Sequence, residues 1–206
     1  VNPYQNRNTP SPFAFYQAKE IKPENLAAAT SRMFLGIRIE CAQCHDHPFD
    51  SWKQKDFWGY ATFFAAMQRQ RVGNGFFGQL QELFTRRTLT VPDTNEVVNA
   101  TFLTGESPQV PAGSSARMTL ADWVTSKDNP YFARTAANRM WGHLFGIGIV
   151  DPVDDFSDSN PPSHPQVLDL LAQQLVAHDF DLKFLVRAIT SSRTYQLTSS
   201  VRSEDD

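Results

Sequence analysis

The ten residues CAQCHDHPFD, from Cys41 to Asp50, contain both cysteines of this 206-residue chain and two of its five histidines. Within them, Cys41, Cys44 and His45 form a Cys-x-x-Cys-His pattern, which is the attachment pattern of c-type haem. Two thiols three residues apart on one turn can each form a thioether to a porphyrin, and the next residue can give the iron an imidazole ligand. The spacing therefore predicts covalently bound haem c, with His45 as the proximal ligand.

The same side chains permit two other interpretations. A zinc ion could be bound by Cys41, Cys44 and either His45 or His47. Because the sequence has no second Cys-x-x-Cys or His-x-x-x-His, a fourth ligand would come from a distant histidine: His143, His164 or His178. Alternatively, the thiols could form a disulfide or a redox dithiol. A thioredoxin-type dithiol opens a helix after a strand, whereas we expect a helix to lead into Cys41.

The second axial position of a haem iron is filled by Met, by His, or left open. A filled position is typical of electron transfer, and an open one is typical of small-molecule chemistry. The candidates are Met67, Met118, Met140, His47, His143 and His164. Met33, Met67 and Met140 lie in apolar stripes, where core packing is expected. His143 lies on the polar stripe of a predicted helix beside Gly142, and a glycine there costs about 1 kcal/mol relative to Ala, which indicates close approach of another group. We therefore take His143 as the candidate distal ligand, the alternative being that this stripe faces water.

Helical periodicity surrounds the motif. A helix is predicted from Pro23 to Glu40, and a second from Trp52 to Met67, capped by Asp50 or Ser51. The second carries an aromatic stripe that suits either the core or a wall around a flat apolar ligand. Residues 1–20 read as an extended arm.

The rest of the chain is predicted to be a connector followed by a second helical half. Residues 72–113 alternate β-branched residues with turn signals, which indicates a connector with two short strands. Helices are predicted over residues 115–126, from an Asn129 cap to Gly146, over residues 164–177, and after an Asp181 cap. The fold class is thus all-α, mainly helical, with a short irregular or β insert between two helical halves. The predicted modules are residues 1–71, truncated at the N-terminus, 72–113 and 114–206.

Composition excludes several functions. A net charge of -3 without a Lys/Arg cluster gives no electrostatic attraction for nucleic acid or an anionic membrane. No apolar run approaches the roughly 20 residues of a membrane span. The chain lacks an initiator Met, so we expect preceding sequence to have been removed.

The acidic loop DPVDDFSDSNPPS does not have EF-hand spacing, and the sequence shows no nucleophile elbow, paired carboxylates or phosphate loop.

Four long segments carry a resemblance to a known family: FLGIRIECAQCHDHPFDSWKQKDFWGYATFF, LADWVTSKDNPYFARTAANRMWGHLFGIGIVDPVDDF, NPPSHPQVLDLLAQQL and DLKFLVRAITSSRTYQLT. The chain resembles the paired domains of unknown function in large cytochrome-associated proteins of planctomycetes. The resemblance covers most of residues 20–200, from the end of the first domain through most of the second. The positions that match the family's short blocks are Cys41, Cys44, His45, His47, Asn138, Arg139, Trp141, His143, Gly146, Asp154, Asp155, Ser163, His164 and Pro165.

The resemblance implies an exported protein, because members of the family are typically exported and often carry an additional cytochrome c-like domain. Together with the motif, it leads us to expect an extracytoplasmic c-type haem protein. Such a protein would transfer electrons to a redox partner or to further cytochrome subunits, rather than catalyse a substrate reaction. The alternative is a structural or carbohydrate-associated surface module whose Cys/His cluster binds zinc or forms a disulfide.

Overall fold

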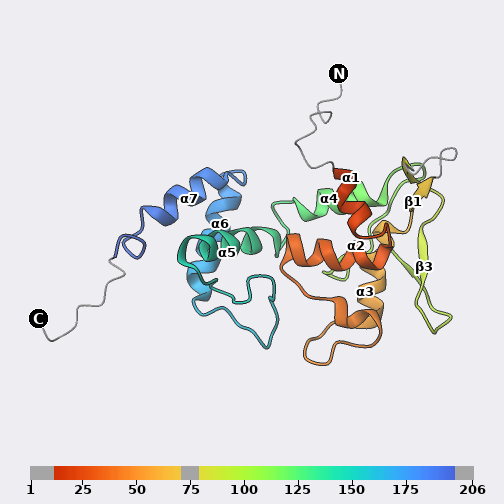
Figure 1. Cartoon of the computed structure of the whole chain (residues 1–206), viewed down its shortest axis with the longest axis horizontal. Coiled ribbons are helices and arrows are strands. Elements are labelled where there is room, and N and C mark those ends of the chain that lie inside the picture. The colour runs from red at the N-terminus through yellow and green to blue at the C-terminus, as the bar shows by residue number, and fades with distance from the viewer. Residues whose placement is uncertain (1–11, 71–78, 198–206) are drawn as a thin grey trace, which may run out of the picture. The chain divides into compact units, whose positions relative to one another are not determined.

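The computed structural model describes residues 12–70 and 79–197, and these residues are mainly helical (Figure 1). They contain seven α-helices and two small antiparallel sheets of two strands each. The prediction of a mainly helical fold is confirmed, and the sheets mean that the class is not strictly all-α. The chain forms two compact units, which divide between Ser126 and Lys127.

The first unit begins with two short helices, α1 (Pro12–Ala18) and α2 (Pro23–Thr30). The prediction of an extended arm is therefore wrong for residues 12–18, and its earlier part lies outside the described residues. Pro23 occupies the first helical turn as predicted. The helix does not continue to Glu40, because α2 passes into a π-helical turn, η1 (Ser31–Leu35), and Gly36 takes a left-handed φ of 70° that ends it.

The motif begins inside the 3-10 turn η2 (Glu40–Gln43) and ends at His45. The next helix is α3 (Gln54–Ala61), which continues into the 3-10 turn η3 (Thr62–Phe64). The predicted helix from Trp52 thus starts two residues later, and it ends before Met67. Its predicted cap is also wrong, because the N-cap residue is Lys53, whose backbone N–H donates to an Asp56 carboxylate oxygen at 2.9 Å.

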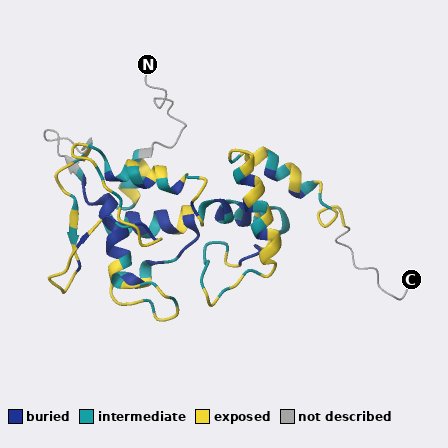
Figure 2. Ribbon diagram, turned by 180° about the vertical axis from the view of Figure 1, so that it is seen from behind, coloured by how far each residue is buried: buried dark blue, intermediate teal, exposed yellow. Residues whose placement is uncertain are grey.

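The aromatic stripe of α3 and η3 forms the core of the first unit. Of the predicted stripe, Phe57 is 0% exposed, Phe64 2% and Trp58 7%. The neighbouring Tyr60 and Phe63 are 0% exposed as well, and Figure 2 shows buried residues concentrated on α2 and α3. The rings contact one another edge to face, as in the pair formed by Tyr60 and Phe63, whose centroids are 6.2 Å apart. Core packing is therefore confirmed for this stripe.

Both sheets belong to the first unit. β1 (Met67–Gln70) pairs with β2 (Gln79–Glu82), and β3 (Thr88–Thr90) pairs with β4 (Val97–Asn99). The registers place Met67 opposite Glu82 and Leu89 opposite Val98. The connector therefore contains three described strands rather than two.

The helix α4 (Ala116–Val124) packs into the first unit. The ring of Phe102 stacks between Phe63 and Trp123, with centroid distances of 5.0 and 4.6 Å. Arg117 of α4 donates to the Tyr16 hydroxyl of α1 at 2.8 Å and to a Glu82 carboxylate oxygen of β2 at 3.3 Å. Three separate elements of the first unit therefore contact this helix.

The second unit consists of α5 (Phe132–Phe145), α6 (Pro165–Ala177) and α7 (Leu182–Thr190). Two of its predicted caps, Gly146 and Asp181, are confirmed, whereas the N-cap residue of α5 is Tyr131 rather than Asn129. The Asn129 side chain accepts from the backbone N–H groups of Tyr131 and Phe132, both at 2.9 Å, and Asp181 accepts from that of Lys183 at 2.8 Å. Gly146 ends α5 with a left-handed φ of 82°. The core is formed by Ala137, Ile149, Val150, Leu168, Leu175, Leu185 and Ile189.

Candidate functional site

The Cys-x-x-Cys-His turn is attached to the core by its second residue. Ala42 is 0% exposed, and its backbone N–H donates to the Ile39 carbonyl at 2.9 Å. Cys41 and Cys44 are both exposed and are free thiols. The turn therefore presents two accessible sulfur atoms while its backbone stays anchored.

The imidazole of His45 is oriented by the next residue. Its Nδ1 lies 2.7 Å from the carbonyl oxygen of Asp46. Because a carbonyl oxygen can only accept, Nδ1 carries the proton, and the neutral ring keeps the lone pair of Nε2 for a metal ion. The His45 side chain is exposed. This tautomer fits a proximal iron ligand.

His47 has the opposite arrangement. Its Nδ1 accepts a hydrogen bond from the backbone N–H of Phe49 at 3.2 Å, so in the neutral ring Nε2 carries the proton and has no free lone pair. Its own backbone N–H donates to the Trp52 carbonyl at 2.8 Å. The role of His47 in this conformation is to shape the loop.

Asp46 ties the end of the motif to α3. Its Oδ1 accepts from the backbone N–H of Gln54 at 3.0 Å, and its Oδ2 lies 3.2 Å from Lys53 Nζ. The hydrogen bond from Gln54 and then the interaction with Lys53 hold the pKa of Asp46 below its ordinary value. The carboxylate therefore stays charged, and continues to accept from Gln54, to a lower pH than an ordinary aspartate would.

The turn offers two free thiols and one imidazole, which are donor types used both by haem attachment and by zinc sites. Zinc needs about four ligand atoms converging within roughly 2.0 to 2.3 Å of one point. In the part of the chain that the structure describes, no three His, Cys, Asp or Glu side chains are grouped to hold a metal ion. Haem attachment uses two sulfurs and one nitrogen at three separate points of a large ring. Zinc binding would require these side chains to rearrange or a ligand from elsewhere.

Side chains predicted to pack in the core, or to form a wall around a cofactor, differ in their burial. Trp58 of α3 is 7% exposed and packs against Phe57, so it contributes to the core. Met67 is buried as predicted, at 4% exposed, whereas Met33 is 45% exposed, which contradicts core packing at that position. Within the motif stretch, Phe49 is 77% exposed and offers an apolar ring at the surface.

In the second unit, the polar stripe of α5 contains one fully buried residue that bonds the backbone of a loop. Asn138 is 0% exposed, its Nδ2 donates to the Val150 carbonyl at 2.8 Å, and its Oδ1 accepts from the Val150 N–H at 2.9 Å. A side chain at Gly142 would come within 3.1 Å of Val153, so the close approach inferred from this glycine is confirmed. The idea that the whole stripe faces water is wrong at Asn138. His143 is exposed, and its role as a distal ligand stays a prediction.

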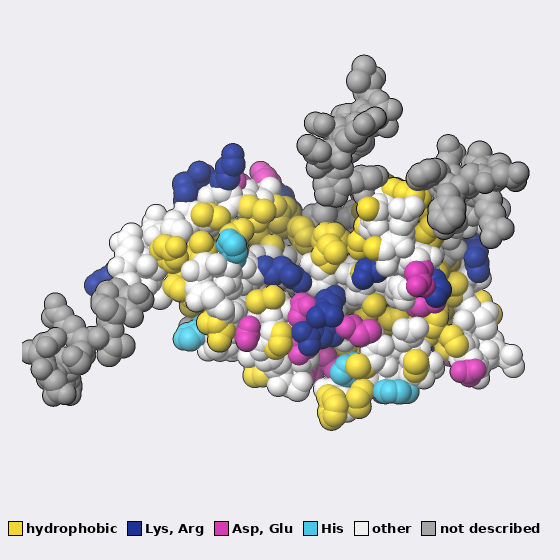
Figure 3. Space-filling model, in the orientation of Figure 1, with side chains coloured by type: hydrophobic (Ala, Val, Ile, Leu, Met, Phe, Trp, Pro, Cys, Tyr) yellow, Lys and Arg dark blue, Asp and Glu magenta, His cyan; other side chains and the backbone are white. Residues whose placement is uncertain are grey.

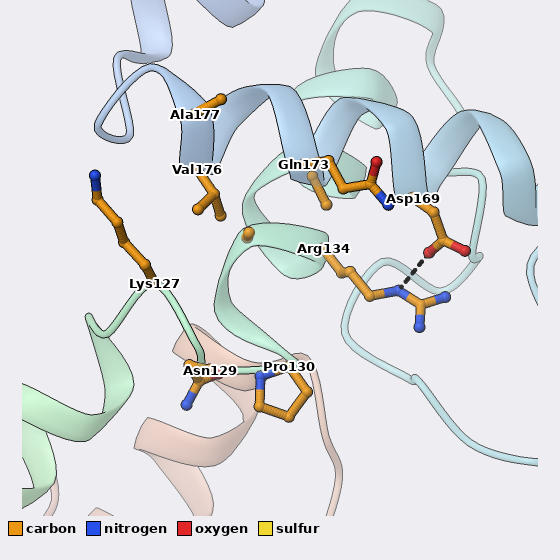
Figure 4. Close-up of a pocket in the computed structure, with 10 residues that line it drawn as sticks. Lys127, Asn129, Pro130, Arg134, Asp169, Gln173, Val176 and Ala177 are labelled. Carbon is orange, nitrogen blue, oxygen red and sulfur yellow. Dashed lines mark ion pairs between the residues drawn. The ribbon is translucent and has the colours of Figure 1, made fainter.

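Two hollows lie away from the motif. One, of about 400 Å³, lies between α6 and the segment that leads into α5 (Figure 4). Its floor is apolar, and its charges are already paired: Lys127 with Asp179, and Arg134 with Asp169 at 3.3 Å. The other, of about 350 Å³, lies in the first unit and is lined by Lys55, Asp56, Gly59, Val97, Val98, Asn99, Thr101, Gly105 and Ser107. Neither hollow includes a residue of the Cys-x-x-Cys-His turn.

The surface charges are mixed. Figure 3 shows the basic and acidic side chains of the face in view as small interspersed patches, in agreement with the net charge of -3. No helix within residues 12–70 and 79–197 is long and apolar enough to cross a membrane.

Two family models match this chain, one on each side of the connector. Residues 4–69 match the family PSCyt2, a protein of unknown function (DUF1549), and residues 116–206 match PSD1, a protein of unknown function (DUF1553). The resemblance drawn from the sequence is confirmed: the chain carries these two paired domains. No curated protein and no solved structure matches it.

The two matches do not coincide with the two structural units. The PSD1 match begins at Ala116, which is the first residue of α4, and α4 packs into the first unit. The second sequence domain therefore supplies a helix to the core of the first unit.

Proposed function

We propose that the chain is a c-type haem protein that transfers electrons, in which Cys41 and Cys44 tether the cofactor and His45 is its proximal ligand. The observation that carries the proposal is the His45 ring, whose Nδ1 is bonded to the Asp46 carbonyl at 2.7 Å, so that Nε2 is free to bind iron. The exposed thiols are accessible for thioether formation. When bound, haem supplies a reversible one-electron change at its iron.

The exposure of the motif supports electron transfer. Cys41, Cys44 and His45 are all exposed, so a partner could approach closely without opening the fold. Phe49 adds an exposed apolar ring to the same stretch. The partner would be a redox protein or further cytochrome subunits. The proposal places the protein outside the cytoplasm, as the resemblance implies.

The test is covalent attachment. The chain is produced in a host that loads Cys-x-x-Cys-His proteins, and the denatured polypeptide is weighed by mass spectrometry. We expect the mass of one haem on the wild-type chain, one remaining thioether in Cys41→Ser or Cys44→Ser, and none in the double variant. His45→Ala should lose the proximal-ligand signature in the absorption spectrum, whereas His47→Ala, the matched control, should keep it.

Two results would count against the proposal. The first is a wild-type chain without covalent haem when another Cys-x-x-Cys-His protein is loaded in the same host. The second is elemental analysis that finds stoichiometric zinc and no iron. That second result would favour a structural or carbohydrate-associated surface module in which the cysteines bind zinc.

A further inference from the structure

Two side chains of α3 hold the backbone of the motif. The indole Nε1 of Trp58 donates to the Gln43 carbonyl at 2.9 Å. The side-chain Nε2 of Gln54 donates to the same carbonyl at 3.3 Å and to the Cys44 carbonyl at 3.1 Å. The two peptide groups that flank Cys44 are therefore both bonded to one helix.

These contacts replace hydrogen bonds that the turn cannot make internally. η2 is a 3-10 turn of four residues, and the last carbonyls of such a turn have no partner within it. Trp58 is a stiff donor, because its ring is buried against Phe57 with centroids 5.4 Å apart. The core of the first unit therefore fixes the position of the Gln43 carbonyl.

Gln54 also acts on the far side of His45. Its backbone N–H donates to Asp46 Oδ1 at 3.0 Å, while its side chain donates to the Cys44 carbonyl. The residues before and after His45 are thus both held by Gln54. Because two thioethers and an axial bond must form on one ring, a turn already held in one conformation loses less freedom on attachment.

We infer that Gln54 and Trp58 are positioning residues that hold the two peptide groups flanking Cys44 in the conformation required for haem attachment. The inference rests on the proposed function. Trp58 acts through the Gln43 carbonyl, and Gln54 acts through the carbonyls of Gln43 and Cys44.

The variants remove donors with little change of shape. Gln54→Met keeps the length of the side chain without its N–H groups, and Trp58→Phe keeps a ring in the core without the indole N–H. Gln173→Met, on an exposed face of α6, is the matched control. Unfolding by urea, followed by circular dichroism of the full chain, establishes that each variant is folded.

Two readouts separate positioning from general stability. The amides of Ala42 and His47 lie on either side of Cys44 and His45 and donate to the Ile39 and Trp52 carbonyls. In the haem-free chain, hydrogen exchange at these two amides should be about five- to tenfold faster in each variant, since Trp58→Phe removes one hydrogen bond that holds the turn and Gln54→Met removes two. Exchange in α2 should be unchanged. In the host that attaches haem, the fraction of chains carrying covalent haem should fall several-fold, and further in the double variant.

The outcomes distinguish the two proposals. Unchanged exchange at the Ala42 and His47 amides in folded variants would overturn the positioning role, whether or not haem is attached. Normal haem loading in the double variant would overturn it as well. A wild-type chain that takes no haem would refute the proposed function, while faster exchange in the variants would still support a turn held by Gln54 and Trp58.

Discussion

Replacing Asn138 by Ala should strongly destabilise the second unit. Asn138 is 0% exposed and bonds both backbone groups of Val150, at 2.8 and 2.9 Å, and Val150 itself is 1% exposed. Within the described residues, no other group bonds to that N–H or that carbonyl. The substitution therefore leaves two buried backbone groups unpaired, each at a cost of about 1 to 3 kcal/mol. A third, longer bond to the Val153 carbonyl, at 3.4 Å, adds little.

The expected loss is about 3 to 5 kcal/mol in the free energy of unfolding. That is a large part of the roughly 5 to 15 kcal/mol that stabilises a typical domain. The assay is urea unfolding of the full chain, with hydrogen exchange measured on peptides from α5, α6 and α7. Asn138→Asp keeps the acceptor for the Val150 N–H but loses the donor, and should be destabilised as well.

The matched control is Gln173→Ala, which removes an exposed amide from a helix of the same unit and should change stability by less than about 0.5 kcal/mol. A loss below about 1 kcal/mol in Asn138→Ala, with the fold unchanged, would refute this reasoning. It would mean that water or a shift of the loop satisfies Val150 at little cost.

Three further perturbations test other parts of the fold. Gly148→Ala should prevent native packing of the second unit, because a methyl group there would overlap the Val150 carbonyl oxygen; a thermal midpoint equal to that of the wild type would contradict this. Leu120 of α4 is 3% exposed, so Leu120→Ala should lower the free energy of unfolding by about 2 to 5 kcal/mol and accelerate hydrogen exchange in α3. The control is Asp122→Ala at an exposed position of the same helix, which should change neither. Equal exchange in the two variants would show that α4 does not stabilise the first unit. Burial raises the pKa of Tyr60 above its ordinary value of 10.0, so the unfolded state loses this proton first and stability should fall as pH rises above about 10. Urea midpoints measured across that range should fall less steeply in Tyr60→Phe, and identical slopes would contradict the assignment.

Several features of the fold could be predicted because their causes are local. Pro23 starts a helix, Gly146 ends one, and Asp181 caps one, since each acts on backbone groups within a few residues. Gly142 indicated a close approach in the helix interior, and the contact with Val153 confirmed it. The approaching group could not be named from the sequence, because it lies on a loop that returns to the helix.

Other features could not be predicted. The helix expected to reach Glu40 ends at Gly36, because a glycine in a left-handed conformation outweighs the apolar periodicity that follows it. Asn138 looked like a surface residue in a polar stripe. In the structure it is buried, and its amide group donates to the Val150 carbonyl and accepts from the Val150 N–H. These bonds compensate for the loss of water around a polar side chain.

The sequence by itself determined the residues of the candidate site, the end of α5 at Gly146, the Asp181 cap of α7 and the mainly helical character, since these follow from residue type and short-range spacing. Only the tertiary structure decided that α4 completes the first unit, that Met33 is exposed, and that Gln54 and Trp58 hold the turn from ten and fifteen residues away. The physical reason is that burial and hydrogen-bond partners between distant segments depend on how helices pack. Periodicity along a single segment contains no information about that packing.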